Sequence, residues 1–328
     1  MDVPDYDLPA EAIAQVPAEP RDSARLFVAL GGPASHLRVA NLPQLLGPGD
    51  VVVVNTSRVV PARLRLRKAS GGMAEVLLLE RLPGRAGRWE ALVRPGRRLA
   101  PGTVLFAGDR PVLEVGERRP DGNREVSSLV EDLGAFGSVA LPPYIHRPLD
   151  DPERYQTVYS DRPGSVAAPT AGLHLTAATL EECRRQGAEV ASLDLAVGLA
   201  TFRPIKSEQV AGHSMHAERY RIPEATWRAC KQAERVLAVG TTTVRALESA
   251  AATGLLEDRT ELFIQPGHAF SVVDVLMTNF HQPRSTLLVL LEAFAGPRWR
   301  ELYELALAEG YRFLSFGDAM VVGRGVLH

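Results

Sequence analysis

The pattern of hydrophobic residues changes near residue 150, and this change limits the folds open to the chain. Residues 72–115 hold short β-type runs separated by Gly- and Pro-rich turns, namely MAEVLLLERL, RWEALVR, TVLFAG and PVLEVG. Runs of that length and spacing are typical of a small all-β barrel or sandwich. Residues 116–128 are expected to form a hairpin-like polar link. After residue 150, helix and strand patterns alternate, with strands expected at ELFIQPG (261–267) and SVVDVLMTNF (271–280), as in α/β domains. We predict an α/β (mixed α+β) large domain formed by residues 1–62 and 150–328, with a small all-β, barrel-like domain inserted at 63–149.

Length and composition support two globular domains. The chain has 328 residues, of which 45% are hydrophobic and 23% charged, as in water-soluble globular proteins. Cys183 and Cys230 both lie in helix-like runs without a ligand-spaced partner, which argues against a disulfide framework or a zinc site. The first 16 residues contain three Asp and one Glu and no apolar signal segment, and no run reaches the length of a membrane span. We therefore expect a cytoplasmic protein without membrane contact.

Basic residues are concentrated in the predicted small domain. Between residues 58 and 110 there are 12 Lys and Arg against 4 Asp and Glu, a local net charge of +8 in a chain whose formal net charge is −2. A solvated, Arg-rich surface is one explanation. However, Arg63, Arg65 and Arg67 alternate with leucines, which predicts a strand with one basic and one apolar face. Because such a stripe can follow a phosphate backbone, we favour a nucleic-acid partner.

The stretch from Arg154 to Thr176 reads RYQTVYSDRPGSVAAPTAGLHLT and has the composition of a structured loop. Its Pro and Gly residues prevent a long helix or strand, while its two tyrosines argue against disorder. Long loops inside compact domains are usually functional or disordered. We therefore interpret this segment as part of a functional site.

A second candidate is VGTTTVRALES, residues 239–249. The pattern predicts a strand, three threonines and then a helix carrying Arg245. Thr241, Thr242 and Thr243 would stand at the helix N-terminus, where free amides and the helix dipole favour an anion. Capping by one threonine is the simpler alternative, but it explains one hydroxyl and not three.

The segment TNFHQPRSTLL, residues 278–288, has a similar design. Asn279 and His281 follow an apolar strand, and ligands collect at the carboxyl ends of parallel strands. A histidine at a strand end is more often structural, but an Asn and a His together favour a site.

The segment HSMHAE places His213 and His216 three residues apart. The spacing resembles that of metal ligands, but no Cys or acid-rich partner lies nearby in the sequence. We prefer proton transfer or hydrogen bonding to a base as the role of these histidines. No Rossmann fingerprint, P-loop or nucleophile elbow is present.

Together these segments resemble the S-adenosylmethionine:tRNA ribosyltransferase-isomerase family of queuosine biosynthesis. The matching pieces run in family order over nearly the whole chain: NTSRVVPARL, LPPYI, RYQTVYSDRPGSVAAPTAGLH, TFRPI, HSMHAE, VGTTTVRALES, VDVLMTNFHQPRSTLL, AFAG and YRFLSFGDAM. The resemblance implies a large α/β domain with an inserted β-barrel. It also implies that S-adenosylmethionine donates its ribosyl unit to 7-aminomethyl-7-deazaguanine in the tRNA anticodon, giving epoxyqueuosine while adenine and methionine leave.

The implied reaction assigns roles to residues. A base must remove a proton beside the sulfonium, and an acid or a hydrogen bond must help adenine depart. On this reading the catalytic candidates are His174, His216, His281, Tyr155 and Asp318. The candidates for binding S-adenosylmethionine are Thr170, Thr241, Thr242, Thr243, Arg245, Asn279 and Phe280. Those for tRNA are Arg58, Arg63, Arg65, Arg67 and Lys68.

The resemblance further implies S-adenosylmethionine as a co-substrate, no permanently bound cofactor and no metal. We expect a monomer whose partners are S-adenosylmethionine and the anticodon region of tRNA. The chain departs from the family pattern at Ala196, where a His is usual, and at Ala200, where a Gly is usual. Two alternatives therefore stay open: a paralogue that uses a small acceptor or merely splits S-adenosylmethionine, and a non-catalytic RNA-binding protein.

Overall fold

The computed structural model describes residues 2–82, 84, 87–96, 99–120, 122–198 and 217–325. It divides into two compact units. Unit 1 comprises Met1–Arg58, Pro142–Arg162 and Ala168–His328, and unit 2 comprises Val59–Leu141 and Pro163–Ala167.

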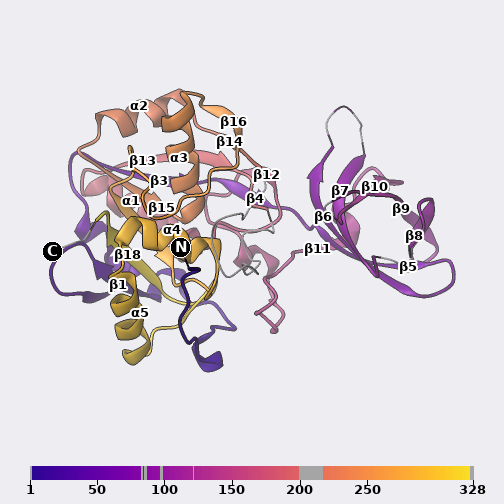
Figure 1. Ribbon diagram of the computed structural model, residues 1–328, viewed down its shortest axis with the longest axis horizontal. Coiled ribbons are helices and arrows are strands. Elements are labelled where there is room, and N and C mark those ends of the chain that lie inside the picture. The colour runs from indigo at the N-terminus through magenta and orange to yellow at the C-terminus, as the bar shows by residue number, and fades with distance from the viewer. Residues whose placement is uncertain are drawn as a thin grey trace. The chain divides into compact units, whose positions relative to one another are not determined.

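Unit 1 is built on a nine-stranded sheet of mixed direction, in the order β16-β14-β13-β3-β15-β17-β18-β1-β2 (Figure 1). Four neighbouring strands, β13, β3, β15 and β17, run parallel to one another, and β18 runs antiparallel to β17. In chain order the strands are β1 (Arg25–Ala29), β2 (Ser35–Arg38), β3 (Asp50–Asn55), β13 (Glu189–Leu195), β14 (Glu218–Arg221), β15 (Arg235–Val239), β16 (Glu257–Thr260), β17 (Val275–Asn279) and β18 (Ala319–Gly323).

The predicted helices form. They are α1 (Ala177–Arg185), α2 (Glu224–Gln232), α3 (Thr241–Thr253), α4 (Thr286–Ala295) and α5 (Trp299–Ala308). Shorter 3-10 turns are η1 (Ala10–Ala12), η2 (Arg21–Ser23), η3 (Val39–Leu45), η4 (Gly134–Phe136, in unit 2), η5 (Pro152–Tyr155) and η6 (Thr170–His174). Thr176 caps α1 by accepting a hydrogen bond from the Thr179 amide, which is the usual role of a threonine at that position.

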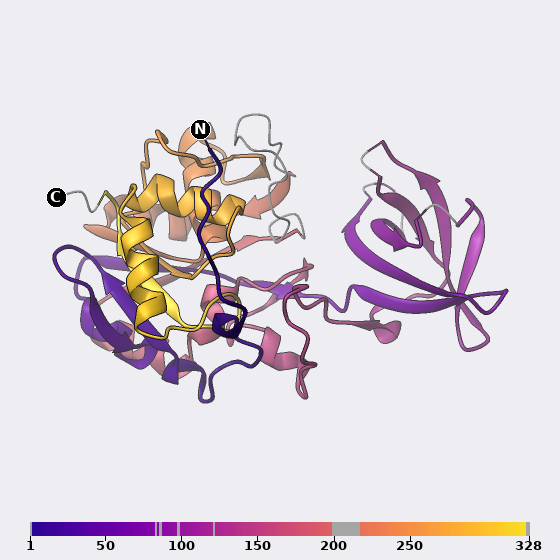
Figure 2. The same ribbon diagram turned by 60° about the horizontal axis from the view of Figure 1, so that its bottom comes forward.

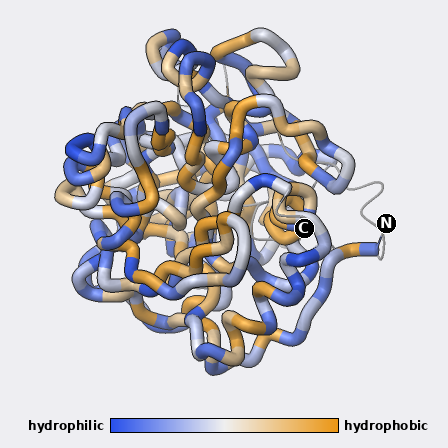
Figure 3. Tube along the Cα trace, turned by 90° about the vertical axis from the view of Figure 1, so that its left-hand side faces the viewer, coloured by the Kyte–Doolittle hydropathy of each residue, from blue (hydrophilic) through white to orange (hydrophobic). Residues whose placement is uncertain are grey.

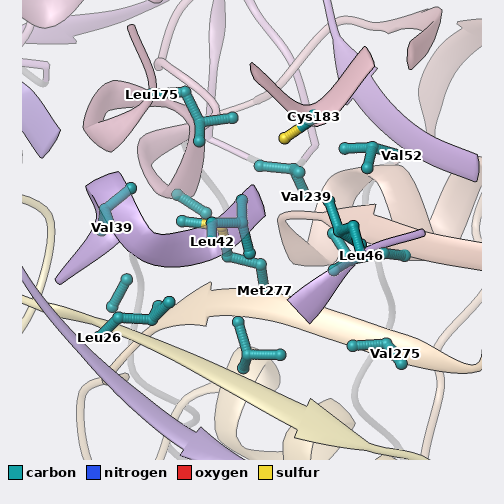
Figure 4. Packing of buried hydrophobic residues seen from close by; sticks show 14 of the residues in the cluster. Leu26, Val39, Leu42, Leu46, Val52, Leu175, Cys183, Val239, Val275 and Met277 are labelled. Atoms are coloured by element: carbon teal, nitrogen blue, oxygen red, sulfur yellow. The ribbon is translucent and has the colours of Figure 1, made fainter. Parts of the chain in front are cut away.

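One face of this sheet packs against α1 and η3 (Figure 4). Alternate residues of the strands point to this face, for example Val52 and Val54 of β3, and meet Leu42 of η3 and Cys183 of α1. Every residue of β3 is buried, as expected for a central parallel strand covered on both sides. The hydropathy trace of this side of unit 1 shows apolar stretches in its middle and polar residues in many outer turns (Figure 3).

Unit 2 contains a closed six-stranded antiparallel barrel (Figure 2). The order is β5-β6-β7-β10-β9-β8, with β8 pairing back onto β5 and the short β11 added beside β5. The strands are β5 (Arg63–Lys68), β6 (Met73–Arg81), β7 (Arg88–Arg94), β8 (Thr103–Ala107), β9 (Arg110–Arg118), β10 (Arg124–Ser128) and β11 (Gly137–Ser138). The predicted fold class is therefore confirmed, and of the two all-β options the barrel is the one that forms.

β4 (Ser57–Val59) and β12 (Arg162–Ser165) pair as a separate two-stranded sheet. Within the segment Arg154–Thr176 these four residues of β12 and the short turns η5 and η6 are the regular elements that the structure describes. The prediction of a structured segment without a long helix or strand is confirmed.

Two local predictions need correction. Residues 116–128 were expected to form a hairpin-like polar link; they do turn back as a hairpin, but they belong to the barrel, since they hold the end of β9 and all of β10, and Val126 pairs with Val115 and is buried. Residues 261–267 were expected to be a strand, which instead lies earlier, as β16. There the Leu262 carbonyl accepts a hydrogen bond from the Arg245 side chain, so it bonds a helix residue rather than a neighbouring strand.

Of the helices in the described ranges, none combines the length and the apolar character needed to cross a membrane.

Candidate active site

The carboxyl ends of the parallel strands meet at one edge of the unit 1 sheet, and Asn55 ties three of the elements there together. Its amide accepts from the Leu195 amide at 3.1 Å and donates to the Leu195 carbonyl at 3.0 Å. It also donates to the Thr242 hydroxyl at 3.3 Å. Asn55 is fully buried, so it fixes the ends of β3 and β13 against the start of α3.

The start of α3 has no side-chain cap. Its N-cap residue is Gly240, with φ of 91°, a conformation that residues with a Cβ rarely adopt. The Thr243 hydroxyl does not cap the helix either, because it donates to the Val239 carbonyl at 2.7 Å. The alternative explanation by threonine capping is therefore wrong for this helix, and in the part of the chain that the structure describes no side chain caps its first amides.

Three segments far apart in the sequence enclose a pocket at this edge, which we call the central pocket. It is lined by 168–171, 240–242 and 278–281 except Phe280, together with Val197 and Leu287, and holds about 350 Å³ of empty space, open solvent included. The segment around η6 and the turn before α3 thus share one pocket, as their proposed common role requires. The predicted site residues brought together here are Thr170, Thr241, Thr242, Asn279 and His281.

Two further pockets adjoin the central pocket. The tyrosine pocket, of about 340 Å³, shares Thr170, Asn279, His281 and Leu287 with it and adds Tyr144, Phe280, Gln282, Ser285, Leu314 and Ser315. The arginine pocket, of about 310 Å³, shares Thr241, Thr242 and Leu287 and adds Arg245, residues 262–264, Thr286 and Leu290.

Asn279 is the centre of a hydrogen-bond network between the central and tyrosine pockets. Its Oδ1 accepts from the Thr170 hydroxyl at 3.0 Å. Its Nδ2 donates to the Leu314 carbonyl at 3.1 Å and to His174 Nε2 at 3.0 Å. Leu314 has a φ of 67°, and non-glycine residues held in that region often lie at functional sites.

His174 is held in one protonation state by this network. Because an amide NH₂ can only donate, Nε2 of His174 must accept. Burial, reinforced by three neighbouring arginines, lowers the pKa of His174 to about 3. The neutral ring therefore carries its proton on Nδ1. His174 lines none of the three pockets, so the structure gives it a role in orienting Asn279.

His281 lines both the central and the tyrosine pocket. Burial lowers its pKa to about 3, so it is unprotonated at neutral pH. Its Nε2 lies 3.0 Å from the Thr278 hydroxyl. Its backbone is fixed from two sides, because its amide donates to the Tyr303 hydroxyl at 2.8 Å and its carbonyl accepts from the Tyr6 hydroxyl at 2.5 Å.

Tyr144 and Ser315 line the site but are not among the residues predicted from the sequence. The Tyr144 hydroxyl lies 2.7 Å from the Ser315 hydroxyl, and both residues line the tyrosine pocket. Burial raises the pKa of Tyr144 to about 12, so it keeps its proton and can donate a hydrogen bond. The signal was available, since Tyr144 belongs to LPPYI and Ser315 to YRFLSFGDAM, but neither motif names a chemical role.

The structure does not bring Tyr155 or Asp318 to any of the three pockets. Tyr155 is fully buried and packs edge-on against Phe316 with ring centroids 6.0 Å apart. The Asp318 carboxylate accepts from the Arg25 amide at 2.9 Å and the Arg312 amide at 2.8 Å. Both residues are thus committed to packing and to the backbone. Phe280 lines the tyrosine pocket but stacks on Phe313.

Arg245 is part of a buried ion pair. Its Nη1 bonds the Glu218 carboxylate, its Nε donates to the Leu262 carbonyl at 3.1 Å, and both charged side chains are at most 6% exposed. The Gly198 amide donates to the other oxygen of Glu218 at 2.8 Å. Arg245 therefore reaches the arginine pocket with its charge already balanced.

The predicted nucleic-acid residues fall into two groups. Arg58, in unit 1, pairs with Glu153 at 2.5 Å and donates to the Ser160 hydroxyl at 2.9 Å. The others lie on β5, where Leu64 and Leu66 point into the barrel and are buried, Arg65 and Arg67 are exposed, and Arg63 and Lys68 are half-buried. The predicted alternation of faces is confirmed.

His216 and Ala200 lie outside the described residues. Ala196 is described and half-buried, next to Val197 of the central pocket. In the described part of the chain no three His, Cys, Asp or Glu side chains are placed to hold a metal ion.

Comparison with known proteins defines the family. Residues 2–322 match the queuosine biosynthesis protein family. The S-adenosylmethionine:tRNA ribosyltransferase-isomerase of Rubrobacter xylanophilus is 50% identical over 97% of this chain and 96% of its own length. The protein of that name from Thermus thermophilus is 52% identical, covering 97% of this chain and 98% of its own length.

A solved structure is also similar. The crystal structure of the S-adenosylmethionine tRNA ribosyltransferase of Thermotoga maritima aligns with a TM-score of 0.55 and 36% identity, covering 97% of this chain and 99% of that one. This chain belongs to the queuosine biosynthesis protein family.

Proposed function

We propose that this chain transfers and isomerises the ribosyl moiety of S-adenosylmethionine onto 7-aminomethyl-7-deazaguanine in the tRNA anticodon. The products are epoxyqueuosine, adenine and methionine. The observation that carries the proposal is the central pocket, where Thr170, Thr241 and Asn279 line one space with His281. Family membership supports it, since relatives at about half identity carry the name of this activity.

The two titratable side chains of the pockets suit the proton transfers of this reaction. A proton must leave the carbon beside the sulfonium, and His281 is a neutral base in the central pocket. The departing adenine needs a hydrogen-bond donor, and Tyr144 stays protonated beside Ser315. Burial thus holds His281 unprotonated and Tyr144 protonated before the reaction, and it also makes His281 a weaker base and Tyr144 a weaker acid than the free side chains.

Asn279 and Thr170 are positioning residues in this proposal. The Thr170 hydroxyl donates its hydrogen bond to Asn279 Oδ1. Its oxygen lone pairs are therefore left for a ligand in either pocket. It can therefore accept a hydrogen bond from a ribose hydroxyl or an amino group. His174 acts behind Asn279, by fixing the direction of its amide.

In this proposal, tRNA contacts the outer face of the barrel. Arg65 and Arg67 are exposed there, and no acidic side chain among the described residues lies at salt-bridge distance from them, whereas the Arg58 charge is balanced by Glu153. The proposal includes S-adenosylmethionine as co-substrate, no permanently bound cofactor, and a monomer that works in the cytoplasm.

Release of adenine tests the proposal. The protein is incubated with S-adenosylmethionine alone, with unmodified tRNA, and with tRNA that carries the aminomethyl base, and free adenine is measured. Release that requires the modified tRNA supports the proposal. Release without any tRNA points instead to a paralogue that splits S-adenosylmethionine, and retained tRNA binding without release points to a non-catalytic RNA-binding protein.

A further inference from the structure

The arginine pocket contains two buried polar groups without a partner. Arg245 is 4% exposed and Thr286 is 5% exposed. Among the described residues, neither Nη2 of Arg245 nor Oγ1 of Thr286 has a hydrogen-bond partner, although both residues line this pocket. Buried polar groups are normally paired. Two unpaired donors in the lining of one pocket therefore indicate that a bound ligand accepts hydrogen bonds from them.

The same pocket lies at the N-termini of two helices. Thr241 opens α3, which has 13 residues and no side-chain cap, and Thr286 opens α4, which has 10 residues. Ser285 caps α4 through the Leu288 amide, so the Thr286 hydroxyl is not needed for capping. Both helix dipoles favour negative charge at this point.

The chemistry of the lining selects the kind of ligand. Glu218 already balances the charge of Arg245, so the pocket offers hydrogen-bond donors and helix ends without excess positive charge. A singly charged group that only accepts hydrogen bonds fits these donors, which describes a carboxylate. Leu262, Ile264 and Leu290 form an apolar wall beside them, suited to an aliphatic chain.

We propose that the arginine pocket is a carboxylate subsite, completed by Thr286 Oγ1 and Arg245 Nη2, that holds the amino-acid end of S-adenosylmethionine. The aliphatic part of that end lies along the apolar wall. Methionine occupies the same subsite after the ribosyl unit has left. This inference rests on the proposed function and adds Thr286 as a specificity-determining residue.

The Thr286→Val variant tests the subsite by calorimetric titration with two probes, S-adenosylmethionine and its decarboxylated analogue. Valine keeps the shape and removes a hydroxyl that is unpaired in the free protein, so the fold should lose no stability. Wild-type protein should bind S-adenosylmethionine about tenfold or more tighter than the analogue, as expected for hydrogen bonds to a charged group. Thr286→Val should lower the affinity for S-adenosylmethionine about tenfold and leave the affinity for the analogue unchanged.

Thr226→Val is the matched control. Its hydroxyl is buried but donates to the Ser192 carbonyl at 2.7 Å, away from the three pockets. This variant should lower the melting temperature while both affinities stay at the wild-type value.

The outcomes separate the subsite from the function. The subsite is overturned if Thr286→Val lowers the affinity for both probes equally, or for neither. It is also overturned if wild-type protein binds both probes with equal affinity. Adenine release that depends on modified tRNA can persist in each of those cases, which keeps the proposed function intact. Wild-type protein that binds no S-adenosylmethionine contradicts the function and the subsite together.

Discussion

His281 and Asn279 lie two residues apart at the end of β17, but the structure gives them different tasks. The Oδ1 atom and both N–H groups of Asn279 form hydrogen bonds with protein partners. The His281 ring lies within hydrogen-bond distance of the Thr278 hydroxyl and lines two pockets. At the scale of single residues, Asn279 therefore sets the geometry, and His281 is the group available to take a proton.

The variant His281→Asn should lower the rate of adenine release with modified tRNA by about a hundred- to ten-thousandfold, the usual contribution of a general base. Asparagine can still bond Thr278 but cannot act as a base. The affinity for S-adenosylmethionine, measured by titration, should change much less than the rate. His146→Asn, at an exposed position, is the control, and a rate for His281→Asn within threefold of wild type would exclude His281 as the base.

At the scale of elements, Glu248 joins α3 to the segment that leads into β17. It is 2% exposed, and its carboxylate accepts from the amides of Ser271, Val272 and Val273 at 2.8–3.0 Å. Because α3 begins at the central pocket, this clamp also holds the pocket wall.

Glu248→Gln should therefore lower the free energy of unfolding by about 1–3 kcal/mol, because the amide keeps only one acceptor oxygen and so loses the Ser271 amide or the buried amides of Val272 and Val273. Urea denaturation followed by circular dichroism measures the change. Glu304→Gln on the exposed side of α5 should be nearly neutral, and similar losses in the two variants would mean that the clamp contributes no stability.

The affinity of the barrel for tRNA should depend on salt concentration. If Arg65 and Arg67 contact tRNA phosphates, replacing both with Ala should weaken binding and reduce the slope of log affinity against log salt by about one per arginine. Filter binding between low and high salt measures the slope. The exposed Arg228 of α2 provides the control variant Arg228→Ala, and an unaltered slope in the double variant would remove β5 from the interface.

The elements differ in how well the sequence predicts them. Apolar alternation predicts β5, because Leu64 and Leu66 must be buried together. The same approach fails for β10, where charged and serine residues at 124–128 hide a strand whose pairing partners lie elsewhere in the chain. It also fails for 261–267, where periodicity predicts a strand. There the Leu262 carbonyl accepts a hydrogen bond from the Arg245 side chain instead of from a neighbouring strand.

The candidate site divides in a similar way. Thr241, Asn279 and His281 are predictable, since polar residues at the ends of parallel strands meet at one edge of the sheet, and Thr170 is predictable because it lies in the loop-like segment 154–176. Tyr144 and Thr286 are not. Their importance comes from a raised pKa and from an unpaired hydroxyl, and both properties depend on what surrounds the side chain in the folded protein.

At the scale of the whole molecule, the buried histidines set the response to acid. The pKa values of His174 and His281 are about 3 in the folded protein against 6.5 as the ordinary value. Between these pH values the unfolded chain binds more protons than the folded one, so the free energy of unfolding rises with pH and falls as the solution is acidified.

In His281→Asn this acid sensitivity should be smaller by up to about 1.4 kcal/mol per pH unit between pH 6.5 and 3, the share of one histidine. Urea denaturation at several pH values measures the slope, and the same slope in variant and wild type would contradict a neutral, buried His281. Above pH 7 the variant and wild type should run parallel, because neither state then takes up the proton.

The position of β18 has a consequence for synthesis on the ribosome. This strand, residues 319–323, lies between β17 and β1 in the sheet, and β1 pairs with it and with β2. While the chain is being made, the β1–β2 hairpin must wait for nearly 300 further residues before its partner emerges. Nascent chains that stop short of residue 319 should therefore keep the edges of β1 and β17 open, and so depend on chaperones until the missing strand closes the gap.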